Sequence, residues 1–173
     1  TRQSLMTTQK FYAGIGSRDT PKSVLKQMTR IARELEKRDW TLRSGGAVGA
    51  DTAFENGVTD PNNKEIFAVD KHGNTVGYEL KPWAVEIAEK YHPNWKRVCE
   101  SEFIKTLISR NTYQIYGYFK SSLKSEFVVC WTVGGGLVGG TAQAIRIAID
   151  LGIPVYNLAL RADKQKLYKL LWD

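Results

Sequence analysis

Three glycine-rich stretches of the sequence carry the residue types that recognise phosphate. Residues 14–18 are Gly-Ile-Gly-Ser-Arg, residues 44–51 are Ser-Gly-Gly-Ala-Val-Gly-Ala-Asp, and residues 134–141 are Gly-Gly-Gly-Leu-Val-Gly-Gly-Thr. Glycine allows the backbone to approach a ligand closely, so that main-chain N–H groups donate directly to an anion. The residue types favour binding of a phosphorylated nucleotide over a chemical reaction.

The first stretch combines backbone donors with two polar side chains. Gly14 and Gly16 free the backbone, Ser17 adds a hydroxyl group, and Arg18 adds a guanidinium group. A guanidinium group is suited to bidentate contacts with phosphate. The alternative is a tight turn between a strand and a helix, with Arg18 in solvent.

The second stretch is more specific. Gly45 and Gly46, which follow Ser44, permit close approach to a ligand, and Gly49 permits a tight start of the next helix. Asp51 has two interpretations, as a helix cap or as a partner of a ribose hydroxyl group. Because no Gly-Lys-Ser/Thr sequence occurs, the chain does not resemble a P-loop NTPase.

The third stretch places Thr141 at the N-cap or first position of a predicted helix. There the helix dipole and the free N–H groups, including those of Gly139 and Gly140, favour an anion. Trp131 ends the preceding strand, where it either stacks on a base or packs in the core.

Arg110 and Asn111 interrupt the apolar side of the helix predicted over residues 103–119. This helix precedes the strand that leads into the third glycine loop, so both side chains can point into the same site. We therefore include them as candidate ligand-binding residues. The alternative for Arg110 is a surface salt bridge.

Hydrophobic spacing predicts the elements that must position these residues. Strands are expected at residues 10–15, 40–43, 64–68, 126–131 and 155–158. Helices are expected at residues 22–38, 51–56, 83–90, 103–119, 141–151 and 162–171. Pro21 suits the first position of the first helix, with Asp19 or Thr20 as its cap, and residues 70–81 are expected to form a loop or an inserted hairpin.

Alternating strands and helices predict a Rossmann-like three-layer α/β fold, with a mostly parallel sheet and helices on both faces. Ligands of such sheets gather at the carboxyl ends of the strands. Each glycine stretch follows a predicted strand, so we expect all three to meet at that edge.

Composition favours an anionic partner, either a nucleotide or a nucleic acid. The 173 residues include 25 Lys and Arg against 18 Asp and Glu, a net charge of +7, although no long basic run occurs and a solvated basic surface is the alternative. No apolar run is long enough for a membrane helix and no secretory signal is evident, so we expect a cytoplasmic protein. Two His and two unpaired Cys predict no metal site, and we expect no cofactor.

The first five residues, Thr1 to Leu5, precede Met6 and look like a tag remnant. We expect residues 6–173 to form a single nucleotide-binding domain.

Residues 12–21, 42–54, 139–143 and 154–157 together resemble the SLOG superfamily. This superfamily has the Rossmann-like fold shared by the Smf/DprA DNA-processing proteins, the LOG phosphoribohydrolases and molybdenum-cofactor carrier proteins. The similarity is strongest to small single-domain DprA-like proteins, many of them encoded by bacteriophages. It covers most of residues 10–158 and implies nucleotide binding and a homo-oligomer.

The chain departs from the LOG phosphoribohydrolases at one position. Residues 107–111 are similar to their MHxRK motif, and Gly140 and Thr141 match the GT of their PGGxGTxxE motif, but Ala144 takes the place of the glutamate. In those proteins this glutamate is implicated in N-glycosidic cleavage, so the resemblance argues against an enzyme. An enzyme of this kind would need another carboxylate, from Asp51, Glu55 or Glu126.

Three functions follow from the residues and the resemblance. The first is binding of a nucleotide or a nucleotide-derived signal; for a phage-encoded chain the resemblance implies sequestration of a host defence signal. The second is LOG-like N-glycosidic hydrolysis. The third is DprA-like binding of nucleic acid.

Overall fold

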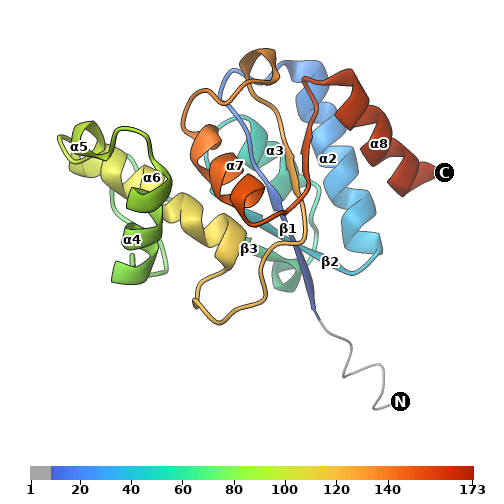
Figure 1. Ribbon diagram of the computed structural model, residues 1–173. Helices are drawn as coiled ribbons and strands as arrows, with labels where there is room; N and C mark the ends of the chain where they lie inside the picture. The colour runs from blue at the N-terminus through green and yellow to red at the C-terminus, as the bar shows by residue number, and fades with distance from the viewer. Residues whose placement is uncertain (1–8) are drawn as a thin grey trace.

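Five parallel strands form one sheet in the order β3-β2-β1-β4-β5 (Figure 1). The computed structural model describes residues 9–173; the proposed tag remnant and Met6 lie outside them. The strands are β1 (Lys10–Gly14), β2 (Trp40–Ser44), β3 (Lys64–Ile66), β4 (Val128–Cys130) and β5 (Val155–Asn157). The chain moves outward from β1 to β3 and then returns to place β4 on the other side of β1. The carboxyl ends of β1 and β4 therefore meet where the winding reverses, which is where open α/β sheets bind ligands.

Helices cover both faces of this sheet. One face carries α2 (Lys22–Lys37), α3 (Ala50–Asn56) and α8 (Arg161–Trp172), and the other carries α6 (Glu102–Tyr116) and α7 (Thr141–Asp150). Helix α4 (Pro82–Tyr91) packs on α6, and the short α5 (Trp95–Val98) precedes α6. Two 3-10 turns, η1 (Pro61–Asn63) and η2 (Val133–Gly135), complete the elements. The Rossmann-like three-layer α/β fold predicted from the sequence is confirmed.

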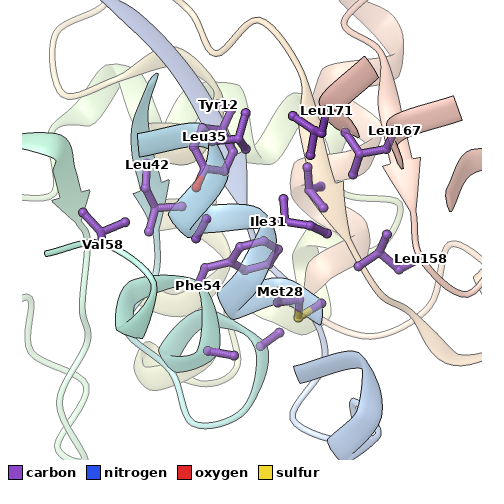
Figure 2. Packing of buried hydrophobic residues seen from close by; sticks show 14 residues of the cluster. Tyr12, Met28, Ile31, Leu35, Leu42, Phe54, Val58, Leu158, Leu167 and Leu171 are labelled. Carbon is purple, nitrogen blue, oxygen red and sulfur yellow. The ribbon is translucent and has the colours of Figure 1, made fainter. Parts of the chain in front are cut away.

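Strand periodicity sorts the apolar side chains of the sheet into the two larger core clusters. On one face Tyr12 and Leu42 pack against apolar side chains of α2, α3 and α8, as Figure 2 shows. On the other face Ala13 and Val128 pack against α6 and α7. Neighbouring residues such as Tyr12 and Ala13 enter opposite clusters because successive side chains of a strand alternate between faces. No helix among residues 9–173 is long and apolar enough to cross a membrane.

Two local predictions were wrong. Neither Asp19 nor Thr20 caps α2: its N-cap is Pro21 without a side-chain hydrogen bond, and the Thr20 hydroxyl donates to the Ser17 carbonyl instead (2.6 Å). The helix expected to reach residue 119 ends at Tyr116, because Gly117 has a φ of +84° and leaves the helix.

Glu36, near the end of α2, holds the segment that leads into β3. Its carboxylate accepts hydrogen bonds from the backbone N–H groups of Thr59 and Asp60, and from the side chains of Thr59 and Asn63. Partial burial acts to raise the pKa of Glu36, but these hydrogen bonds outweigh it and lower the pKa to about 2.

We predict that Glu36→Gln lowers the free energy of unfolding by about 1–2 kcal/mol at pH 7, a value discounted for the partial exposure of the carboxylate. The native pKa of about 2 lies below the ordinary 4.5. The difference should therefore be full above pH 4.5 and shrink as the pH falls towards 2. Urea unfolding at pH 7 and pH 3 measures it. Glu34→Gln, which removes only a surface ion pair with Arg38, is the control and should cost less than about 0.5 kcal/mol; an equal loss in both variants would contradict the assignment.

Candidate ligand-binding pocket

A pocket of about 470 Å³ lies at the carboxyl edge of the sheet. It is bounded by the loop after β1, the start of α3, helix α6 and the loop before α7. Nine of the predicted site residues line it: Gly16, Ser17, Arg18, Asp51, Arg110, Asn111, Gly139, Gly140 and Thr141. The convergence of the first and third glycine stretches on one pocket follows from the parallel sheet.

The loop after β1 is fixed by its own hydrogen bonds. The Ser17 N–H group donates to the Trp131 carbonyl (3.2 Å), and the Ser17 hydroxyl accepts from the Asp19 N–H group (3.0 Å). A Cβ atom on Gly16 would lie 2.6 Å from that of Ala50, so only glycine permits this close approach to α3. Arg18 is exposed at the pocket, and its guanidinium group forms no ion pair or hydrogen bond within residues 9–173.

Five other predicted site residues do not line the pocket. Gly14 and Ser44 are buried, and the Ser44 hydroxyl donates to the Gly14 carbonyl (2.6 Å), which joins β1 to β2. Gly46 and Gly49 have φ values of +68° and +96°, a backbone conformation that favours glycine. The carbonyl of Gly45 faces α6.

Trp131 does not line the pocket either. Its side chain packs against the core cluster on the α2 side of the sheet. Of the two interpretations of Trp131, core packing is the one seen in the structure.

Asp51 does not act as the N-cap of α3. That position belongs to Gly49, and Asp51 lies within the first turn, where its Oδ2 atom accepts from the Ala47 N–H group (3.2 Å). The side chain is 5% exposed and reaches the pocket. Burial raises the pKa of Asp51 to about 6, although the Arg110 charge and hydrogen bonds from the loop act in the opposite direction.

Arg110 is buried, with 6% exposure, which excludes the surface salt bridge considered for it. Its Nη1 atom donates to the carbonyls of Gly45 and Phe67, each at 2.7 Å, and its Nε atom donates to Oδ1 of Asn111 (2.9 Å). The Nη2 atom has no hydrogen-bond partner within residues 9–173. Arg110 therefore holds the second glycine loop through Nη1, while its Nη2 atom stays unpaired among the described residues.

Asn111 extends the same link to the third glycine loop. Its Nδ2 atom donates to the carbonyl of Gly140 (2.9 Å), while its Oδ1 atom accepts from Arg110. Two adjacent residues of α6 thus connect the loop after β2 to the loop before α7. The sequence identified both residues as candidates, but nothing in their spacing revealed these partners.

The start of α7 faces the pocket with unpaired donors. Gly140 is the N-cap and Thr141 is the first helical residue; no side chain caps the helix, and its first turn has no acidic residue. The N–H groups of both residues are free of backbone partners within residues 9–173. The positive end of the helix dipole lies at the same point.

An apolar wall lines the same pocket as these donors. The sequence did not identify it as part of the site. It is formed by Phe103, Ile104, Leu107 and Ile108 of α6, together with Val138 of the third loop. The sequence placed these residues of α6 only on the apolar side of a predicted helix. Their position within two turns before Arg110 on the same helix is the feature that could have identified them as part of the site.

Only one of the three carboxylates considered for catalysis lies at the pocket. Asp51 lines the pocket, whereas Glu55 pairs with Lys64 (3.2 Å) and Glu126 precedes β4, at the amino end of the sheet. Ala144 lies on the buried side of α7, fully enclosed in the core, and does not line the pocket. Within residues 9–173 no three His, Cys, Asp or Glu side chains are grouped to hold a metal ion.

No protein-family model matches the chain, and no curated protein matches its sequence. Among solved structures, DNA processing protein A from Helicobacter pylori is similar, with a TM-score of 0.58 and 19% identity. The similarity covers 96% of this chain and 75% of that chain, whose structure was described for its single-stranded DNA binding mode. At this identity the comparison establishes a common fold.

We predict that Asp51→Asn removes a pH-dependent cost to stability. The pKa of Asp51 is about 6 in the native protein against an ordinary 3.8, so the native state favours the protonated carboxyl. Stability from this group is full below pH 4 and is lost as the pH rises through 6. Relative to the wild type, the variant should therefore gain about 1–3 kcal/mol between pH 4 and pH 8.

Urea unfolding of both proteins across this pH range measures the difference, in which the other titrating groups cancel. A difference that stays flat, or that falls with rising pH, would contradict a raised pKa at Asp51.

Proposed function

We propose that this pocket binds the phosphate group of a nucleotide-type ligand. The observation that carries the proposal is the convergence of unpaired donors on one pocket: the N–H groups at the start of α7, the Arg18 guanidinium group and Nη2 of Arg110. Each is a suitable partner for a phosphate oxygen.

The two arginines have different roles in this proposal. Arg110 is buried and held by three hydrogen bonds, so its free nitrogen is already oriented and little entropy is lost when a ligand binds. Arg18 is exposed and closes on the phosphate from the solvent side. The α7 donors lie on the backbone and need no rearrangement.

The remainder of the pocket suits a nucleoside. A volume of about 470 Å³ is within the range of small-molecule sites, and the apolar wall around Phe103 and Leu107 offers a surface for a base. Asp51, with a pKa of about 6, offers a carboxyl group to a ribose hydroxyl group. The apolar wall and the carboxyl group are on the same pocket as the phosphate donors.

We predict that AMP binds with an affinity at least ten times that of adenosine, because adenosine lacks the phosphate group. Isothermal titration calorimetry against mono-, di- and cyclic nucleotides measures this at pH 7. Arg18→Ala should weaken AMP binding by about tenfold or more, the effect of losing one charged hydrogen bond. Arg33→Ala removes the same charge from an exposed position of α2 and should have little effect.

Equal affinity for AMP and adenosine, or no nucleotide bound more tightly than millimolar, would refute the proposal. Chromatography of the bound nucleotide after long incubation separates holding from cleavage: intact AMP supports a binding protein, and free base supports the N-glycosidic hydrolase.

A second candidate is that the phosphate in this pocket belongs to single-stranded DNA. The fold similarity to a protein studied for its single-stranded DNA binding, together with a net charge of +7, favours it. If it is correct, a short oligo(dT) should displace AMP from the pocket, and Arg18→Ala should weaken both ligands. Binding of both at once would place the oligonucleotide elsewhere.

A further inference from the structure

The positive charge of the chain is concentrated on two neighbouring helices. Helix α2 carries five Lys or Arg and two Glu, and α8 carries four Lys or Arg and one Asp. Each helix therefore has a net charge of +3, and together they account for +6 of the net charge of +7 of the chain. The dispersed charges of the sequence gather on one face of the fold.

Direct contacts join α2 and α8. The Arg30 guanidinium group lies 4.2 Å from the centre of the Trp172 ring, and the Arg38 guanidinium group donates to the carbonyls of Leu170 and Leu171. Both helices cover the same face of the sheet (Figure 1). Lys22, Lys26 and Arg30 are exposed and four residues apart, so they form one stripe along α2.

A shallow groove of about 530 Å³ follows one side of α8. Its lining residues are Arg161, Lys164, Gln165, Tyr168, Lys169, Trp172 and, as the one acidic side chain among them, Asp173. Tyr168 and Trp172 are half-buried and pack edge to face, with ring centres 5.0 Å apart. The Lys164 ammonium group lies 5.5 Å from the centre of the Tyr168 ring. The groove therefore combines cations with partly exposed aromatic rings.

We propose that this α2/α8 surface, consisting of the Lys22–Lys26–Arg30 stripe and the groove on α8, binds single-stranded nucleic acid. Lysine and arginine neutralise backbone phosphates, and the aromatic rings offer stacking surfaces to unpaired bases. A solvated basic face requires no aromatic rings, and a duplex does not expose base faces to them. The surface is separate from the pocket, none of whose lining residues belongs to α2 or α8.

The test is fluorescence anisotropy of a labelled oligo(dT) of about twenty nucleotides, titrated with the whole chain over a series of salt concentrations. If four cations contact phosphates, the logarithm of the affinity should fall against the logarithm of salt concentration with a slope of about −3. Lys164→Glu combined with Lys169→Glu should weaken binding by at least tenfold. Tyr168→Leu should weaken it about fivefold or more, because base stacking is lost.

Lys96→Glu combined with Lys120→Glu is the matched control, since it makes the same change in net charge at exposed positions. Lys96 lies on α5, at the opposite end of the molecule from α8 (Figure 1). This control should change the affinity less than threefold, and circular dichroism checks that every variant is folded.

This proposal and the second candidate for the pocket predict opposite effects of Arg18→Ala on oligo(dT) binding, and the nucleotide proposal for the pocket is tested separately with AMP. The α8 variants should keep their affinity for AMP, and Arg18→Ala should keep its affinity for oligo(dT). Four results would each overturn the proposal: equal weakening by the control pair, loss of oligo(dT) binding through Arg18→Ala alone, duplex DNA bound as tightly as the single strand, or anionic vesicles bound in place of the oligonucleotide.

Discussion

The buried guanidinium group of Arg110 is the interaction on which the pocket depends. Removing an arginine from water is costly, and this cost is offset only if its nitrogens find good acceptors. Here two carbonyls and the Asn111 side chain provide them, and Asn111 in turn holds the carbonyl of Gly140. A Cβ atom on Gly45 would lie 2.5 Å from Nη1 of Arg110, so the glycine is required for this approach. The two glycine loops therefore have fixed positions because one helix holds both.

This arrangement places a carboxyl group and two cations around one small space. Asp51 and Arg110 both flank Gly45, yet they do not form an ion pair, and the buried carboxyl keeps a pKa of about 6. Near neutral pH the pocket therefore changes charge with modest changes in pH. An incoming phosphate adds negative charge beside Asp51, which should raise the pKa of Asp51 further and favour its protonation. Under the proposed function, phosphate binding would therefore be coupled to proton uptake at Asp51.

Hydrophobic periodicity was sufficient to predict the fold. Apart from the short α5, which the sequence did not predict, strands and helices were located within a few residues because apolar spacing and turn residues agreed along most of the chain. The site was harder to predict from the sequence. Residue type suggested Arg110 and Asn111, but their acceptors are backbone carbonyls 65 and 29 residues away, and backbone acceptors have no signature in a sequence. The role of Phe103 was missed because apolar spacing does not distinguish a pocket wall from a core. The cap predicted for α2 was wrong because the Thr20 hydroxyl group donates to the carbonyl of Ser17 and does not pair with the first turn of the helix.

The α2/α8 surface illustrates the same limit for charge. No basic run exists in the sequence, since the cations lie in segments separated by more than a hundred residues. They become neighbours because Leu167 and Leu171 of α8 must be buried against the same core as Met28 and Leu35 of α2. Burial of one apolar side of each helix leaves the charged sides together on the outside. A surface that concentrates positive charge in this way is a consequence of core packing, and its repulsion must be tolerated by the fold. A bound polyanion would relieve that repulsion, so nucleic acid should stabilise the native state as well as bind to it.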